Sequence, residues 1–279
     1  MFSSTSTPLQ EPRIIPGSCF KFNVESEPIP MTLFILIYVS VLGLVLGSFF
    51  NVVALRIPVG KSIINPPSCC GHCGTRLRAA DLIPVVSYLV SRGKCRYCGD
   101  SLSILYPAGE ALTGLLYLWI VLRFGVTSEG MIGLLLVSLT VIVSLSDLKY
   151  MRIPNKVLLF FAPLLLLGGL LFPTQPWWEH VLGGLLGGGI ILLFALRGGM
   201  GMGDVKLFAI CGFVLGVPEL ILAFLIACLL GTVIGGGMML IGRVSRKQPI
   251  PFGPWLMIGT LISYGYGSEI IQGYLSLIL

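Results

Sequence analysis

Long apolar runs, separated by short polar or charged segments, follow one another along the chain from residue 32 to residue 277. Several of them approach or exceed the roughly 20 apolar residues that a helix needs to cross a bilayer. We interpret them as transmembrane helices at residues 32–54, 107–124, 130–147, 155–172, 179–196, 205–217, 219–241 and 253–277. The sixth run is short and fits a partial span. The pattern predicts an all-α polytopic membrane protein with about eight transmembrane helices.

The charged residues are few and unevenly placed. The 279 residues are 55% hydrophobic and 11% charged, with a mean hydropathy of +0.95, whereas about a quarter of the residues of soluble domains are charged. Fifteen of the eighteen Lys and Arg residues lie in four clusters, at residues 56–96, 149–156, 197–206 and 243–247. Basic residues beside apolar runs are typical of cytoplasmic loops. Since no basic stretch is interleaved with aromatic residues, the net charge of +6 indicates topology and not nucleic-acid binding.

The same pattern divides the chain into four parts. Residues 1–30 are polar and proline-rich, and we expect a flexible leader there. Residues 31–55 form the first transmembrane helix, and residues 56–105 form a cytoplasmic insertion. Residues 106–279 carry the remaining spans as one membrane core. The fifth span is dense in glycine, which in lipid favours close helix packing.

The insertion contains two C-x-x-C pairs, Cys70 with Cys73 and Cys95 with Cys98, separated by 21 residues. Four cysteines at this spacing are typical of a structural zinc site. An insertion of this size has too small an apolar core to be stable alone, so a metal would stabilise it. A disulfide is disfavoured because cytoplasmic thiols stay reduced. The neighbouring Cys69 leaves open which of two adjacent thiols is the ligand.

Two aspartates lie at the ends of apolar runs. Asp147 ends the third run and Asp204 begins the sixth, and the predicted topology places both at the cytoplasmic face. Two carboxyl groups that approach closely share a proton, so that one can activate a water while the other donates a proton to a carbonyl. Alternatively, each aspartate caps a helix or pairs with Lys149 or Lys206.

Seven stretches together carry a family likeness. They are GSFFNVVALRIP (47–58), DLIPVVSYL with RGKCRYCG (81–89 and 92–99), YPAGEALTG (106–114), DLKYMRIPN (147–155), GMGDVKLF (201–208) and IPFGPWLMIG (250–259). With these motifs, residues 31 to about 275 resemble the type IV prepilin peptidases, membrane aspartyl proteases of the GxGD type.

The resemblance implies that Asp147 and Asp204 are the catalytic pair and that Cys70, Cys73, Cys95 and Cys98 hold zinc. The implied substrates are prepilins or pseudopilins, cut on the cytoplasmic side of a bacterial inner membrane after a glycine and before their hydrophobic helix. Many such enzymes then methylate the new N-terminus with S-adenosylmethionine. For that second site, Glu110 and residues 47–51 are the candidates, although Glu110 also fits a helix-terminal acid.

Two other functions remain open from the residues alone. A proton-coupled transporter would use Asp147 and Asp204 as a relay. A scaffold would bind a partner through the zinc module, while the aspartates only cap helices.

Overall fold

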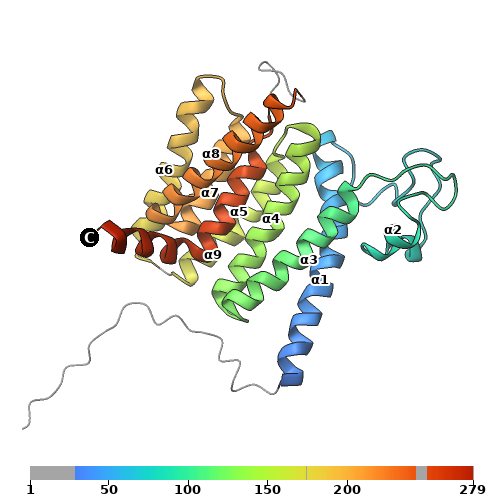
Figure 1. Cartoon of the computed structure of the whole chain (residues 1–279), viewed down its shortest axis with the longest axis horizontal. Helices are drawn as coiled ribbons and strands as arrows, with labels where there is room; N and C mark the ends of the chain where they lie inside the picture. The colour runs from blue at the N-terminus through green and yellow to red at the C-terminus, as the bar shows by residue number, and fades with distance from the viewer. Residues whose placement is uncertain (1–28, 174, 243–249, 279) are drawn as a thin grey trace, which may run out of the picture.

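The computed structural model describes residues 29–173, 175–242 and 250–278. Within these ranges the chain is built from helices, joined by turns and two isolated β-bridges (Figure 1). The expected leader falls almost entirely outside the described residues. The helices are α1 (Ile29–Arg56), η1 (Ile57–Val59), η2 (Ala79–Leu82), α2 (Val86–Val90), α3 (Leu105–Phe124), α4 (Ser128–Tyr150), α5 (Asn155–Leu171), α6 (Trp177–Leu196), α7 (Met202–Leu215), α8 (Val217–Leu240) and α9 (Gly253–Ile278).

Each of the eight apolar runs forms one α-helix, and the all-helical membrane fold is confirmed. Five of the described helices are long and apolar enough to cross a membrane: α1, α3, α4, α6 and α8. Helix α5, with 17 residues, is a shorter apolar helix. Helix α7 has only 14 residues, which agrees with the partial span expected there.

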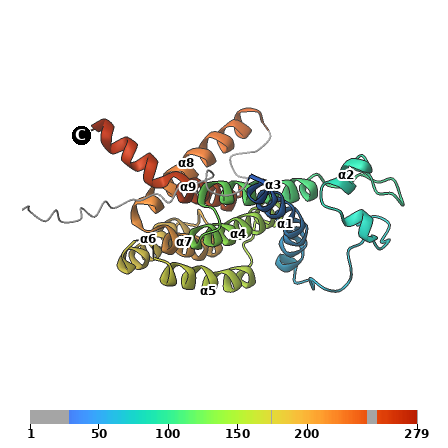
Figure 2. The same ribbon diagram turned by 90° about the horizontal axis from the view of Figure 1, so that it is seen from below.

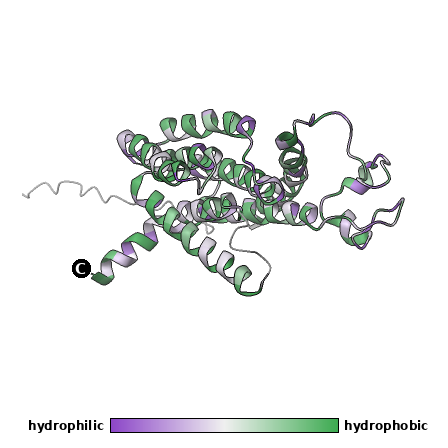
Figure 3. Ribbon diagram, turned by 90° about the horizontal axis from the view of Figure 1, so that it is seen from above, coloured by the Kyte–Doolittle hydropathy of each residue, from purple (hydrophilic) through white to green (hydrophobic). Residues whose placement is uncertain are grey.

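Helix α4 forms the centre of the bundle. It packs against α1, α3, α5 and α9, and most of its apolar side chains are buried. Figure 2 shows α5 along one edge of the bundle and α2 with its loops at the end formed by α1 and α3. Hydrophobic residues dominate the helices, whereas hydrophilic residues gather in the insertion (Figure 3). This distribution is expected of helices in lipid with a polar module beside them.

The turn between α4 and α5 places Asp147 in the last turn of α4. Met151 ends the helix with a left-handed backbone, φ 51°, and the Ser146 hydroxyl donates a 2.6 Å hydrogen bond to the Arg152 carbonyl. Pro154 then lies at the N-cap of α5, where its fixed φ suits the start of a helix. The sequence "IPN" therefore sets where one helix ends and the next begins.

The glycines of α6 allow the closest helix contact in this part of the bundle. A Cβ atom added to Gly183 would overlap the carbonyl oxygen of Gly212 in α7, and one added to Gly187 would lie 2.6 Å from the carbonyl oxygen of Phe208. Gly189 on the same helix faces open space. The glycine-dense span is thus a packing surface, as expected from small residues between membrane helices.

Candidate functional site

A cavity of about 630 Å³ lies where four segments distant in sequence converge. It is lined by residues 57–58 after α1, by the turn from α4 to α5, by residues 198–204 before and in α7, and by residues 250–252 before α9. Asp147 and Asp204 both line it. The fold therefore brings together the two aspartates that the sequence singled out.

Asp147 is buried, with 6% of its surface exposed. Its Oδ2 atom accepts a 2.9 Å hydrogen bond from the backbone N–H of Gly253, the first residue of α9. A charge-assisted bond of this kind orients a carboxyl group. The sequence alone does not indicate Gly253 as the partner of Asp147, because the two residues are 106 positions apart.

Asp204 is partly buried and caps its own helix. Its Oδ2 atom accepts a 3.1 Å hydrogen bond from the backbone N–H of Gly201, at the N-cap of α7. The expected capping role is therefore present. The expected pairing is not seen: Lys206 donates instead to Asn155 Oδ1 at 3.0 Å. Neither aspartate forms an ion pair in the part of the chain that the structure describes.

The two glycines beside Asp204, Gly201 and Gly203, have ordinary backbone conformations. Gly201 has an ordinary extended backbone, φ −82° and ψ 154°, and Gly203 lies within α7. A Cβ added to Gly203 would lie 2.9 Å from the Ile153 Cβ. Gly203 is needed for size, because it lets α7 approach the turn that follows Asp147.

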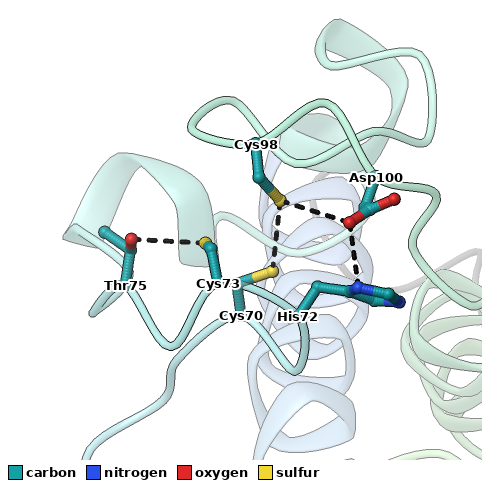
Figure 4. Close-up of polar contacts among 6 residues, drawn as sticks. All are labelled: Cys70, His72, Cys73, Thr75, Cys98 and Asp100. Carbon is teal, nitrogen blue, oxygen red and sulfur yellow. Dashed lines mark hydrogen bonds and ion pairs between the residues drawn. The ribbon is translucent and has the colours of Figure 1, made fainter.

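The four cysteines of the two C-x-x-C pairs form a compact cluster. The Sγ atoms of Cys70, Cys73, Cys95 and Cys98 lie within 4.8 Å of one another, and Cys70 and Cys98 are 3.8 Å apart (Figure 4). Tetrahedral Zn²⁺ with Zn–S bonds of about 2.3 Å holds its sulfur ligands about 3.8 Å apart. The cluster therefore has the donor set and the spacing of a structural zinc site.

The two cysteine pairs have the same backbone fold. The Cys70 N–H donates to the Thr75 carbonyl and the Gly74 N–H to the Cys70 carbonyl, each at 3.0 Å. Equivalent bonds of 2.8 and 2.9 Å start from the N–H groups of Cys95 and Gly99. Both glycines have a positive φ, +68° and +77°, which glycine adopts without strain.

Two neighbouring residues, Cys69 and His72, do not belong to the group of four. Cys69 is exposed and does not belong to the group of four. His72 Nδ1 lies 3.0 Å from Asp100 Oδ2, so its ring is directed toward that carboxylate (Figure 4). The geometry favours Cys70 over its neighbour as a ligand.

A second cavity, of about 420 Å³, lies between the insertion and the bundle. Glu110 and Asn51 both line it. Glu110 is in the second turn of α3, beyond the first turn where a helix-terminal acid would lie. Gly47 instead has a packing role, since a Cβ there would lie 2.9 Å from the Glu110 Cα.

Five helices long and apolar enough to cross a membrane, two carboxyl groups on one cavity and a four-cysteine cluster beside the bundle are the features of a membrane-embedded peptidase family. The chain belongs to the type IV leader peptidase family, whose family model matches residues 134–236. The bacterial peptidase A24 N-terminal domain matches residues 41–124.

Curated relatives cover nearly the same length. The chain is 40% identical over 241 residues to the prepilin leader peptidase/N-methyltransferase of Bacillus subtilis, covering 86% of this chain and 97% of that protein. Relatives with the same name match at 32% in Aeromonas salmonicida (86% and 94% covered) and 33% in Pseudomonas aeruginosa (84% and 91%). No solved structure matches the chain.

Proposed function

We propose that this chain is a bifunctional membrane enzyme that cleaves the leader peptide of prepilins or pseudopilins and then N-methylates the new N-terminus. Membership of the family and the names of the relatives support both activities. The observation that carries the peptidase is the convergence of Asp147 and Asp204 on one cavity. Neither family match supports a transporter.

The two carboxyl groups would act as a unit. With one shared proton, the ionised aspartate takes a proton from a water, which attacks the scissile carbonyl, while the protonated aspartate donates to the carbonyl oxygen. The tetrahedral intermediate then collapses as its C–N bond breaks: the aspartate that took the proton from water donates it to the leaving amine, and a hydroxyl group of the intermediate returns a proton to the other aspartate. The hydrogen bond from Gly253 holds the Asp147 carboxyl in one orientation. The shared proton is a property of the pair of carboxyl groups, because two coupled groups titrate as a unit.

Charge supports a cytoplasmic position for this cavity. Arg152 and Lys156 line it beside the aspartates, and Lys206 follows in α7. Basic residues at the end of spans favour the cytoplasmic side. A prepilin would therefore be cut at the cytoplasmic face of a bacterial inner membrane, after a glycine and before its hydrophobic helix, while that helix remains in lipid.

Cys70, Cys73, Cys95 and Cys98 would hold a structural Zn²⁺. Four thiolates occupy every position of a tetrahedral ion, so the metal supplies folding energy and no open site for water. The metal would keep the insertion, residues 56–105, in shape beside α1 and α3. Its role is therefore structural, and the peptidase chemistry needs no metal.

Mass spectrometry of a co-expressed prepilin tests the proposal. Wild-type enzyme should remove the leader, and Asp147→Asn and Asp204→Asn should leave it intact while remaining folded. Glu129→Gln is a matched control, because Glu129 lies in the first turn of the same helix α4, at the opposite end from Asp147. Cleavage at the wild-type rate by either aspartate variant would refute the assignment. A methyl group on the mature N-terminus identifies the second activity.

A further inference from the structure

The second cavity adjoins the peptidase cavity through a shared wall. In the segment after α1, Arg56 and Val59 line the second cavity, while Ile57 and Pro58 line the peptidase cavity. The end of α4 is divided in the same way: Tyr150 lines the second cavity and Asp147 the other. An amine released at the aspartates is therefore separated from the second cavity only by the segment after α1 and the end of α4.

Glu110 is the distinctive group in this cavity. Only 9% of its surface is exposed, and its Oε2 atom accepts a 2.7 Å hydrogen bond from the backbone N–H of Val85. Within the described ranges it forms no ion pair. A buried carboxylate without a cationic partner is unfavourable, so a cation arriving in the cavity would be stabilised there.

Asp81, the other carboxylate of the cavity, is already satisfied. It accepts hydrogen bonds from the Arg78 N–H at 3.1 Å and the Tyr97 hydroxyl at 2.9 Å, and Arg96 lies 3.3 Å away. The Arg78 N–H and the Tyr97 hydroxyl, together with the Arg96 guanidinium, lower the pKa of Asp81. A cationic ligand would therefore be directed to Glu110.

The rest of the lining suits a nucleoside with an amino-acid tail. Its volume of about 420 Å³ lies within the range of about 300–1,000 Å³ typical of small-molecule sites. Tyr88, Tyr106 and Tyr150 line the cavity, and aromatic rings are groups on which a purine can stack. Lys61 and Lys149 offer positive charge, which would attract the carboxylate of the tail.

We propose that this cavity is the methyl-transfer site, and that Glu110 holds the positive charge of the reaction, that of the S-adenosylmethionine sulfonium. The inference rests on the proposed methyltransferase function. In the reaction, the lone pair of the pilin's terminal nitrogen attacks the methyl carbon, the C–S bond breaks with its electrons passing to sulfur, and the nitrogen loses a proton to water. Asn51, which also lines the cavity, holds the backbone beside it, since its Nδ2 donates a 2.9 Å hydrogen bond to the Tyr106 carbonyl.

Calorimetric binding to the zinc-loaded, full-length protein in lipid nanodiscs tests the inference without turnover. S-Adenosylmethionine carries the sulfonium, and S-adenosylhomocysteine is its neutral product. Glu110→Gln keeps an oxygen for the Val85 N–H and removes the charge. It should weaken binding of the charged ligand relative to the neutral one by roughly tenfold, as expected for loss of a charge-assisted contact. Asp204→Asn should bind both ligands as the wild type does.

A second arm distinguishes the two possible cations. If Glu110 instead holds the terminal ammonium of the pilin, the ratio between the two adenosyl ligands stays unchanged, and a mature pilin peptide loses affinity where its N-acetylated form does not. That outcome would overturn the sulfonium assignment and keep the site. If Glu110→Gln changes neither the ratio of affinities for the two adenosyl ligands nor the ratio for the free and N-acetylated pilin peptides, the inference is wrong.

Ser87→Trp provides an independent probe if Glu110→Gln loses zinc or thermal stability. Ser87 is in α2 and lines the cavity from the side of the insertion, so a tryptophan there should fill the space. Binding of both adenosyl ligands should fall, whereas prepilin cleavage, measured separately, should continue. Unchanged binding in this variant would exclude the cavity. Absence of cleavage by the wild type would count against the peptidase and not against this site.

Discussion

The carboxyl group of Asp147, at the end of α4, is tied to the first residue of α9 by a 2.9 Å hydrogen bond from the Gly253 N–H. The contact is tight, because a Cβ added to Gly253 would lie 2.9 Å from Asp147 Oδ2. The start of α9 thus acts as a fixed support for one of the two aspartates. The same hydrogen bond brings the residues just before α9, including Phe252, to the cavity that Asp147 lines.

Gly253→Ala should therefore displace the Asp147 carboxyl and reduce kcat/KM for prepilin cleavage by roughly 10- to 100-fold, as expected when a reacting group moves by about 1 Å. Gly237→Ala in α8 is a matched control, because a Cβ there meets nothing within 4 Å. Steady-state cleavage of a purified prepilin measures both. Equal activity of the two variants would show that the support from Gly253 is not needed.

Asp204 has two roles that substitutions can separate. Asp204→Asn keeps an oxygen to accept from the Gly201 N–H, whereas Asp204→Ala removes the cap. Both variants should lose cleavage. Only the alanine variant should also lose stability, by about 1 kcal/mol for a lost helix cap. Thermal unfolding in nanodiscs, beside the cleavage assay, checks this; a stable alanine variant would mean that the cap contributes little.

The sequence predicts the helices well because their signals are local. Apolar length, glycines, prolines and flanking charges bounded all eight runs, and Gly216, with φ +79°, separates α7 from α8 as a glycine can. The doubt about the sixth run also had a local cause, since 14 residues are fewer than a full span needs.

The candidate site was only partly predictable for a different reason. Asp147 and Asp204 stand out because acids are rare in apolar chains. The group that orients Asp147 does not stand out in the sequence. It is the backbone N–H of Gly253, a group that nearly every residue carries, and its position depends on how α9 packs on α4. Likewise, the shared wall between the two cavities arises from the way α1 and α4 end side by side, which no motif encodes.

The adjacent thiols Cys69 and Cys70 could not be distinguished by spacing alone. The structure buries Cys70 in the cluster and exposes Cys69. Cys70→Ser should therefore lose bound zinc, and Cys69→Ser should keep it. Elemental analysis of the purified variants, with a colorimetric chelator to follow release, measures both. If Cys69→Ser loses the metal and Cys70→Ser retains it, the ligand assignment must be exchanged.

Loss of zinc should affect the insertion before the bundle. A closed four-cysteine site supplies folding energy to a segment with a small core, so chelation should increase proteolysis within residues 56–105 while the helices stay intact. Limited trypsin digestion with and without chelator, mapped by mass spectrometry, tests this. Cysteine-to-serine variants at Cys95 and Cys98 should give the same fragments as the chelator.

The glycines of α6 give the clearest stability prediction. Gly183 faces the carbonyl oxygen of Gly212 so closely that an added methyl group must push α6 away from α7. Overpacking of this kind costs about 1–3 kcal/mol, so Gly183→Ala should unfold at a lower temperature than the wild type. Gly189→Ala, on the same helix and facing open space, should be neutral or slightly stabilising, since alanine favours a helix over glycine by up to about 1 kcal/mol. Equal destabilisation by both substitutions would mean that glycine in α6 serves flexibility and not contact with α7.

Because Gly203 brings α7 against Ile153, a shift of α7 should also move Asp204, and Gly183→Ala should lose cleavage activity at temperatures where it is still folded.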